Sequence, residues 1–255
     1  MIKFFRHIRQ NLLMENKTSK YLKYAIGEIV LVVIGILIAL QINNWNEERK
    51  STKKEYEIMT NLAEDFKNNL DNLERFIDTI YPKWHFRLKQ NISHIGLKEN
   101  QLNEQIKRDI RWTGYYKTKI IDGSLNSILS SEKLELFRDN KLKNMLTAYP
   151  AEINEFKTLE NNIEHYVLNV QRDIFRHYVS LADDTFFDSI IKLKVAKSDY
   201  EGLMKNMYYQ NTIMGNSLVL DGLKEEAQNL KSATEEIYNL LLENIENNPN
   251  HNLNQ

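Results

Sequence analysis

The stretch AIGEIVLVVIGILIALQI, residues 25–42, decides the fold of this 255-residue chain. It carries one charge, at Glu28, and every residue from Ile29 to Leu40 is apolar or glycine. Eighteen residues of α-helix span about 27 Å, which is close to the roughly 30 Å hydrocarbon core of a bilayer. We therefore predict a single transmembrane helix. The alternative is a helix buried in a protein core, but such a helix normally keeps a polar face.

The charges on either side of this stretch predict its orientation. Residues 1–24 carry six Lys or Arg residues and one acid, Glu15, for a net charge of +5, whereas the charges of residues 47–50 balance. Because an excess of Lys and Arg marks the cytoplasmic side, we expect a cytoplasmic N-terminus and a C-terminal domain outside the cytoplasm. An uncleaved signal anchor is the favoured form. A cleaved signal peptide is the alternative, although residues 40–43 offer no clear pair of small residues for cleavage.

Residues 1–24 have a pattern of their own. Apolar side chains recur at steps of three and four, and most of the basic side chains lie off this row. The pattern predicts a basic amphipathic segment that lies in the inner interface of the membrane, against anionic headgroups. A basic flank without regular structure is the alternative. The apolar row consists of Ile2, Phe5, Ile8 and Leu12.

Three strings near the N-terminus carry a family resemblance: IKFFRHIRQ, then ENK followed by SKYL, then YAIGEIVLVVIGILIALQINNWNE. In this order they closely resemble the opening of a family of uncharacterised single-pass membrane proteins. That family is widespread in Bacteroidota and is known only as a domain of unknown function. The resemblance covers about the first fifty residues. It implies a bacterial inner-membrane protein with a helical soluble part, and it implies no activity, substrate or catalytic residue.

The composition of the remaining chain predicts an all-α domain. Six of the eight glycines and all three prolines follow residue 43, which is too few for the turns of a many-stranded β fold. The whole chain has a net charge of −1, so the part after residue 24 carries −1 − 5 = −6, which argues against nucleic acid as a partner. We expect a transmembrane helix followed by an extended antiparallel helical bundle. The bundle would occupy residues 43–246, and residues 247–255 would form a disordered polar tail.

A row of apolar residues continues the transmembrane helix. The row predicts one amphipathic helix with no break at residues 43–46, closed by Pro82. A second helix would end at Gly96, and a third would begin near Asn103 and break near Gly114. A turn at residues 122–124 would lead into a short helix, and Ser131 would cap the next turn. The row consists of Ile58, Leu62, Phe66, Leu70, Leu73, Ile77 and Ile80.

The strongest pattern after the apolar stretch is a seven-residue repeat. Apart from Glu160 and His177, every position of the repeat is apolar or aromatic, which is typical of helix-on-helix packing in a bundle or coiled coil. Pro150 lies inside it and predicts a boundary or kink at residues 148–150. One row is Leu142, Tyr149, Phe156, Ile163, Val170 and His177, and the other is Leu146, Ile153, Glu160, Val167, Ile174 and Leu181.

The last part of the chain also favours helices. Residues 183–197 are expected to form loop and helix rather than a lone strand. Ser198 and Glu201 fit a capping box, in which the serine accepts from the third helical amide and the glutamate reaches back. A long helical region would follow to Ile245, with a bend at Gly215 or Gly222.

We find no motif that predicts a catalytic residue, a cofactor or a metal site. No histidine has an acidic residue three positions before it, and there is no cysteine or glycine-rich phosphate loop. Asp173 and His177 are four apart and would share a proton or a metal, but a helix-surface pair is the simpler interpretation. Two further groups are ambiguous in the same way. Trp112, Tyr115 and Tyr116 would line a ligand pocket or pack in the core, and Met204, Met207 and Met214 fit the core better.

One stripe of the transmembrane helix is a candidate for helix association. Glu28, Gly35 and Ala39 share a face with Ile42, and small residues let helix backbones approach closely in lipid. A carboxylate in such a helix usually meets a partner or the interface. The alternative is that Glu28 reaches the headgroups and that the small residues are incidental.

These observations predict a membrane-anchored helical binding or interaction module, sensory or scaffolding, of unknown ligand. It would lie in the bacterial inner membrane with a periplasmic domain. Its partners would be the lipid bilayer and either itself or another membrane protein, with no nucleic acid and no cofactor. The alternative is a membrane-tethered enzyme with an unrecognised site in the helical domain.

Overall fold

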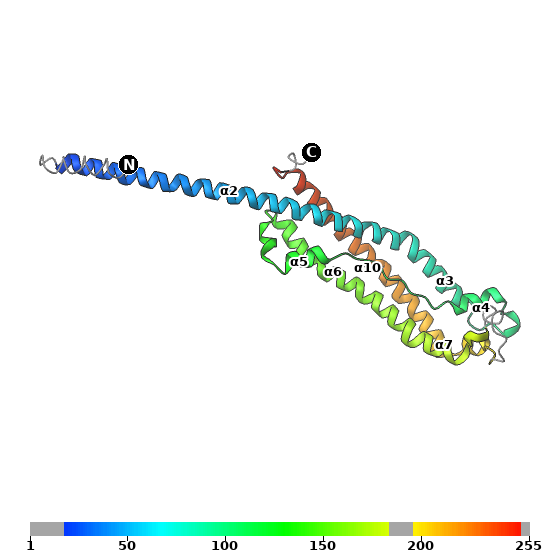
Figure 1. Ribbon diagram of the computed structural model, residues 1–255. Helices are drawn as coiled ribbons and strands as arrows, with labels where there is room; N and C mark the ends of the chain where they lie inside the picture. The colour runs from blue at the N-terminus through cyan, green and yellow to red at the C-terminus, as the bar shows by residue number, and fades with distance from the viewer. Residues whose placement is uncertain (1–17, 184–195, 251–255) are drawn as a thin grey trace.

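The computed structural model describes residues 18–183 and 196–250, and every regular element in these ranges is helical. A long helix leads into an elongated helical bundle (Figure 1). The predicted fold class is therefore confirmed: one long apolar N-terminal helix followed by an antiparallel helical bundle. The predicted amphipathic segment lies mostly outside the described residues, as do residues 184–195 and 251–255.

The apolar stretch and the first rod of the bundle belong to one continuous run of helix. It consists of α2 (Thr18–Arg75), a π-helical turn η1 (Phe76–Ile80) and α3 (Tyr81–Ser93). The predicted absence of a break at residues 43–46 is confirmed. The predicted stop at Pro82 is wrong, because in η1 the Tyr81 amide donates to the carbonyl of Phe76, five residues back. Pro82 then lies in the first turn of α3, where its missing N–H is tolerated.

The end of the bundle that lies away from the apolar stretch begins after α3. Gly96 has φ +84°, a backbone conformation that favours glycine, and it ends this helix region as predicted. A 3₁₀ turn η2 (Glu99–Gln101) follows, and then α4 (Glu104–Arg111). The side chain of Asn103 accepts from the amide of Ile106 at 2.9 Å and caps α4, at the start that the sequence predicts.

Residues 112–122, which we call the return segment, run back along the bundle without regular structure (Figure 1). Side chains of the rods satisfy its backbone. Fully buried Asn69 donates to the carbonyl of Ile121 at 2.8 Å and accepts from its amide at 2.7 Å. Glu160 accepts from the amide of Thr118 at 2.7 Å. This contact explains why the heptad row has a carboxylate at position 160.

The base of the bundle, next to the apolar stretch, contains short helices. These are α5 (Gly123–Leu129) and η3 (Glu132–Leu136), and the Ser131 hydroxyl caps η3 as predicted. The second rod then begins with α6 (Asn140–His165), which Asp139 caps. The helix boundary predicted at residues 148–150 is absent, because α6 continues past Pro150.

The second rod continues as a π-helical turn η4 (Tyr166–Gln171) and α7 (Arg172–Tyr178). The heptad rows are buried as predicted up to Val167. Beyond it Ile174 is also buried as predicted, whereas Val170 is half-buried and His177 and Leu181 are exposed. Gln171 and Phe175, which lie one position after Val170 and Ile174, are buried as well, so the buried face widens by one position across the π turn.

The third rod (Met207–Glu246) returns to the base of the bundle. A 3₁₀ turn η5 (Leu181–Asp183) precedes the undescribed residues, and α9 (Tyr200–Lys205) follows them. The predicted capping box is wrong by one residue, because Asp199 accepts from the amide of Gly202 at 2.7 Å. Asn206 separates α9 from α10 (Met207–Glu246), and α10 is continuous through Gly215 and Gly222, where the sequence predicts a bend.

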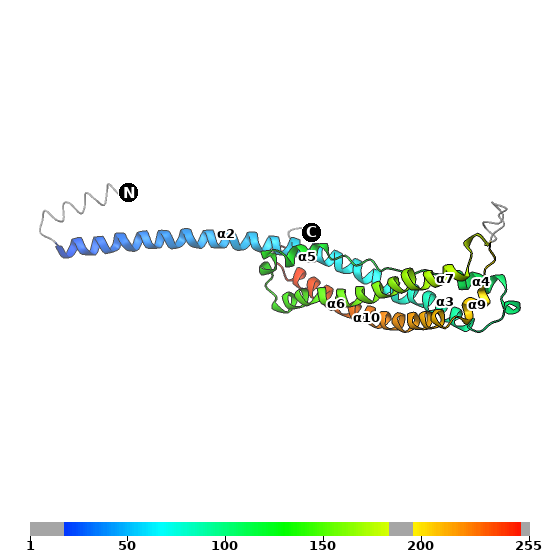
Figure 2. The same cartoon turned by 90° about the horizontal axis from the view of Figure 1, so that it is seen from below.

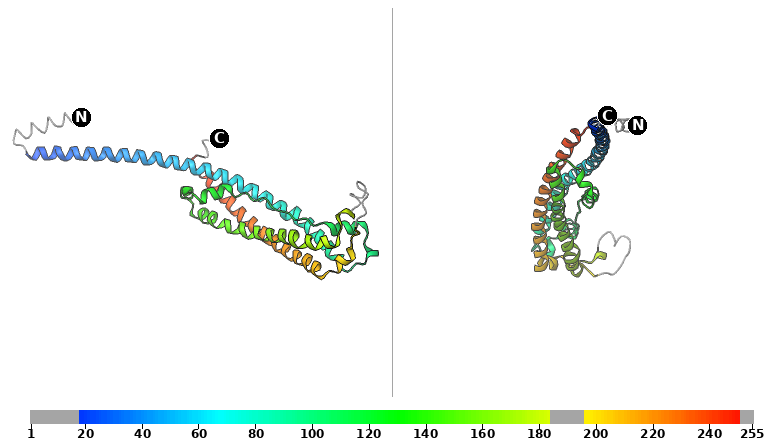
Figure 3. Two further views of the ribbon diagram at one scale, coloured as in Figure 1. Left: turned by 60° about the horizontal axis from the view of Figure 1, so that its bottom comes forward. Right: turned by 90° about the vertical axis from the view of Figure 1, so that its left-hand side faces the viewer.

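The three rods lie side by side, with α10 antiparallel to α2 and α6 (Figures 2 and 3). Aromatic rings fill the core. The ring centroids of Phe66 and Tyr149 are 4.9 Å apart, and the Tyr149 hydroxyl lies 2.8 Å from that of Thr234. The amide of Asn248, 7% exposed, donates to the carbonyl of Thr52 at 3.4 Å. Residues 247–250 therefore form a turn packed on α2, which corrects the prediction that the disordered tail begins at residue 247.

Exposure separates the apolar stretch from the core. The large apolar side chains from Ile29 to Leu40 are 47–63% exposed, so the alternative of a buried core helix is wrong. The helix is long enough and apolar enough to span a membrane. Among the three methionines expected in the core, Met204 is buried, but Met207 and Met214 are 72% and 46% exposed.

Candidate functional site

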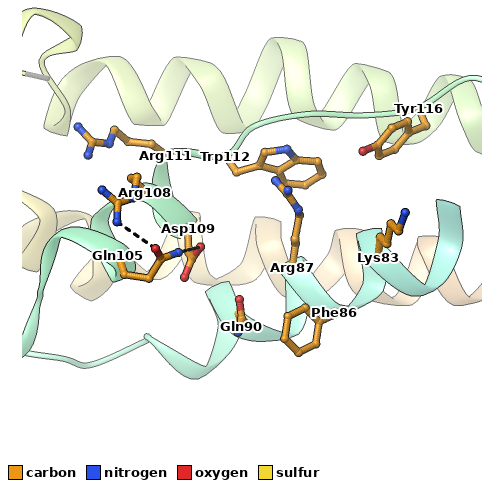
Figure 4. Close-up of a pocket in the computed structure, with 10 residues that line it drawn as sticks. All are labelled: Lys83, Phe86, Arg87, Gln90, Gln105, Arg108, Asp109, Arg111, Trp112 and Tyr116. Carbon is orange, nitrogen blue, oxygen red and sulfur yellow. Dashed lines mark hydrogen bonds between the residues drawn. The ribbon is translucent and has the colours of Figure 1, made fainter. Parts of the chain in front are cut away.

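An open cleft of about 830 Å³ lies at the end of the bundle away from the apolar stretch (Figure 4). We call it the distal cleft. Its walls come from α3, from α4 and from the start of the return segment. It is lined by Lys83, Phe86, Arg87, Gln90, Gln105, Arg108, Asp109, Arg111, Trp112 and Tyr116.

Helical spacing places the lining residues of α3 together. Lys83, Arg87 and Gln90 recur at steps of four and three and share one face of the helix. The neighbouring face carries Trp84 and Leu88, which are buried. Burial of the apolar face in the core therefore turns the basic face toward the cleft.

Arg87 is positioned by an aromatic ring. Its guanidinium carbon lies 5.3 Å from the ring centroid of Trp112, and Figure 4 shows it extending from α3 toward that ring. Such cation–π contacts hold a guanidinium without neutralising it. A Cβ atom at Gly114 would lie 2.7 Å from Cζ2 of Trp112, so the glycine makes room for the ring.

Arg108 is positioned by a neutral amide. Its Nη2 donates to Oε1 of Gln105 at 3.0 Å, and the amide of Gln105 donates to Oδ1 of Asp109 at 3.0 Å (Figure 4). Among the described residues, Lys83, Arg87 and Arg108 form no ion pair with a carboxylate. The lining therefore holds four basic side chains and one acid, and at least three of the cations are not neutralised.

The aromatic cluster predicted around Gly114 divides between two places. Trp112 and Tyr116 lie on the cleft wall with ring centroids 6.5 Å apart. Tyr115 lies outside it and hydrogen-bonds Glu164, which raises the pKa of Tyr115. Lys117, 2.6 Å from Glu164, lowers the pKa of that carboxyl together with Tyr115.

The basic lining residues were not singled out from the sequence. The signal that would have found them is the basic spacing on one face of α3, beside an apolar row. A second signal is the run RDIR at residues 108–111, just before Trp112. Neither signal shows by itself that α3 and α4 face each other.

Among the described residues, the other titratable groups form no comparable site. Asp173 and His177 are both exposed on α7, and no hydrogen bond or ion pair joins them in the described structure. Residues 18–183 and 196–250 contain no group of three His, Cys, Asp or Glu side chains that would hold a metal ion. Tyr81 donates to Oδ1 of Asp221 at 2.9 Å, and burial together with this bond raises the pKa of Tyr81 to about 12.

The stripe proposed for helix association lies on the exposed part of α2. Helical geometry over this whole stretch places Glu28, Gly35 and Ala39 on one face, as the spacing predicts. A Cβ atom at Gly35 would meet nothing within 4 Å, so the face is open there. Association through this stripe stays a prediction.

The fold and the cleft together define a class of protein: a helical bundle behind one apolar helix, with a basic and aromatic cleft at its far end. The chain belongs to the family described as "Family of unknown function (DUF6090)", whose model matches residues 28–211. This match begins inside the apolar stretch and includes all ten lining residues of the distal cleft. A search of the curated proteins and a search of the solved structures each found no match.

Proposed function

We propose that this protein is a membrane-anchored binding module of the bacterial inner membrane. Its N-terminus is cytoplasmic, and residues 43–246 form a periplasmic helical domain that binds its ligand or partner in the distal cleft. The observation that carries the proposal is the group of Lys83, Arg87 and Arg108, which line one cleft without carboxylate partners among the described residues. Cations that have no carboxylate partner in a concave site are suited to binding a negatively charged ligand.

The length of the first rod supports a role as a tether that holds the distal cleft away from the bilayer. Residues 43–83 are helical throughout, which corresponds to roughly 60 Å at 1.5 Å per residue. The +5 charge of residues 1–24 supports the orientation. A bundle held in this way meets solutes or proteins of the periplasm rather than lipid.

Thiol labelling tests the orientation, because the chain has no cysteine of its own. In cells with a permeabilised outer membrane, an impermeant maleimide should label Lys50→Cys and leave Lys3→Cys unlabelled until the inner membrane is broken. The opposite pattern would reverse the topology. N-terminal sequencing of the mature protein completes the test, since a chain that begins near Asn43 would show a cleaved signal peptide.

Affinity capture tests the binding role. The full-length chain is solubilised from membranes in an uncharged detergent, and captured molecules are compared with those of Arg87→Gln/Arg108→Gln. A component retained by the unaltered chain and lost from the double variant supports binding through the cleft. Identical captured material would contradict it.

A further inference from the structure

We propose that the distal cleft binds a small polyanion that carries phosphate groups. The inference rests on the binding function proposed above and names the ligand class of the same site. It begins from the charge of the lining, which holds four basic side chains and one carboxylate, Asp109; of the four, Arg111 pairs with Glu104 at 3.9 Å. The part of the chain after residue 24 has a net charge of −6, so the positive charge of the lining is a local excess within this part.

The arrangement of the two best-defined arginines favours multidentate recognition. Arg87 comes from α3 and is held by the ring of Trp112, whereas Arg108 comes from α4 and is held by Gln105. In each case the holding group leaves N–H donors of the guanidinium uncommitted. Arginine forks with uncommitted donors bind planar or tetrahedral oxyanions through paired hydrogen bonds.

Phosphate matches these donors better than carboxylate does. A carboxylate has two acceptor oxygens in one plane, and a single arginine fork occupies both of them. A phosphate group presents three acceptor oxygens and close to two charges near neutral pH, and a polyanion with more than one such group offers acceptors to Lys83, Arg87 and Arg108 along the cleft, where Arg87 lies between the other two (Figure 4). The two walls of the cleft are therefore bridged more fully by phosphate.

The size of the cleft limits the ligand. About 830 Å³ lies within the range of small-molecule sites, roughly 300–1,000 Å³. The rings of Trp112 and Tyr116 and the exposed ring of Phe86 add apolar wall beside the cations. A compact phosphate ester with an apolar portion fits this lining.

Isothermal titration calorimetry on the full-length chain in maltoside micelles tests the proposal, with pyrophosphate and citrate as probes of similar charge. We expect saturable binding of one pyrophosphate per chain, weakened about ten-fold by either Arg87→Gln or Arg108→Gln. Both side chains are exposed, so the variants should fold. Arg176→Gln, which removes an exposed cation of α7 outside the lining, is the matched control and should bind as the unaltered chain does.

Each other result overturns a defined part of the proposal. Absence of saturable pyrophosphate binding, with normal circular dichroism, excludes a phosphate site. Equal weakening by Arg176→Gln and Arg87→Gln excludes the cleft as the location. Citrate binding as tight as that of pyrophosphate excludes the phosphate class. None of these results bears on the thiol-labelling test, so failure of the ligand class is distinguishable from failure of the membrane-anchored function.

Discussion

The arginines at the two ends of the bundle have opposite environments. At the base, Nη2 of Arg138 donates to the Thr52 hydroxyl at 2.6 Å and lies 3.5 Å from Glu48, while its Nε lies 3.7 Å from Glu55. At the far end, Arg87 faces an indole ring and Arg108 faces an amide. The base therefore neutralises Arg138, whereas the far end positions Arg87 and Arg108 and leaves their charge in place.

This difference separates a structural use of charge from the binding use that we propose for the distal cleft. Glu55 is 4% exposed and also accepts from the amide of Arg138 at 2.9 Å, so the base contact joins α2 to the chain just before α6. A buried carboxylate of this kind contributes mainly to stability. Exposed cations without carboxylates contribute little to stability and are available to a ligand.

The largest effect should come from the base. Glu55→Ala removes the acceptor of the Arg138 amide and leaves the guanidinium with one fewer carboxylate, so we expect a loss of about 2–3 kcal/mol in the free energy of unfolding. Urea denaturation of the full-length chain in micelles, followed by circular dichroism, measures it. Glu57→Ala, at an exposed position of the same helix that pairs with Lys53 at 3.9 Å, should cost less than about 0.5 kcal/mol. Equal costs would remove the structural role of the base contact.

The next effect concerns the far end. Gly114→Ala places a methyl group 2.7 Å from the ring of Trp112, so the ring must move, at a cost of about 1–2 kcal/mol. A shift in tryptophan fluorescence should accompany the loss. Gly215→Ala is the matched control, because nothing lies within 4 Å of its Cβ position in α10, and it should stabilise the helix by roughly 0.5–1 kcal/mol. An unchanged fluorescence spectrum in Gly114→Ala would contradict the packing of Trp112.

Asp139 at the base should make stability depend on pH. The side chain of Asn244 and the amides of Leu142 and Lys141 donate to its carboxylate and hold its pKa below the usual 3.8. Because the folded pKa is lower than the unfolded one, the stabilisation is present above about pH 4 and is lost as the pH falls through the folded pKa. Asp139→Ala should cost about 1 kcal/mol at pH 7.

The comparison with Asp139→Ala is made at pH 7 and again near pH 3. The gap between the unaltered chain and the variant should shrink at the lower pH. Asp71→Ala, at an exposed position of α2, is the control and should show little difference at either pH. A gap that stays constant down to pH 3 would show that the charge of Asp139 has no part in the cap.

Replacement of one arginine at each end of the bundle should give a smaller effect. Arg138→Gln should lower the free energy of unfolding by about 1 kcal/mol, because its side chain is 57% exposed and solvent screens the pairs. Arg108→Gln should change it by less than about 0.5 kcal/mol. Chemical denaturation of the two variants side by side measures the contrast. If Arg108→Gln costs more than Arg138→Gln, the far-end cations are structural.

The smallest effect on the bundle should come from the apolar stretch, which lies outside both ends. Gly35→Ile should weaken association between membrane helices, seen as less cross-linking in membranes, because a large side chain on the small-residue face keeps backbones apart. Bundle stability should not change. Val32→Ile lies off the stripe and should associate normally. Equal cross-linking in the two variants would leave Gly35 without a role in association.

Local pattern predicted much of the fold, and it failed where backbone geometry changed. The heptad rows of the second rod were correct through Val167 and again at Ile174, but after η4 Val170 and His177 are not buried and Gln171 and Phe175 are. Pro82 and Pro150 both lie in continuous helix, although Pro82 predicted a helix end and Pro150 predicted a boundary or a kink. A π turn and a helical proline depend on packing against neighbouring rods, and sequence periodicity carries no information about such packing.

The candidate site was predicted in part. The sequence predicted that Trp112 and Tyr116 would either line a ligand pocket or pack in the core. It did not connect the basic residues with them. Arg87 and Trp112 belong to different elements, and their contact depends on how α4 folds back beside α3. Glu160 likewise had no explanation until the amide of Thr118 was seen to donate to it.

The sequence by itself determined the apolar stretch, the all-α class and the positions of most helices. These follow from composition and from periodicity, which hydrophobic burial imposes on neighbouring residues. Only the tertiary structure decided which polar groups meet. Asn69 and Ile121 are 52 residues apart, and Glu55 and Arg138 are 83 apart. Such pairs form because packing of the rods removes particular backbone and charged groups from water, and these groups must then pair with one another. No local sequence pattern predicts which groups these are.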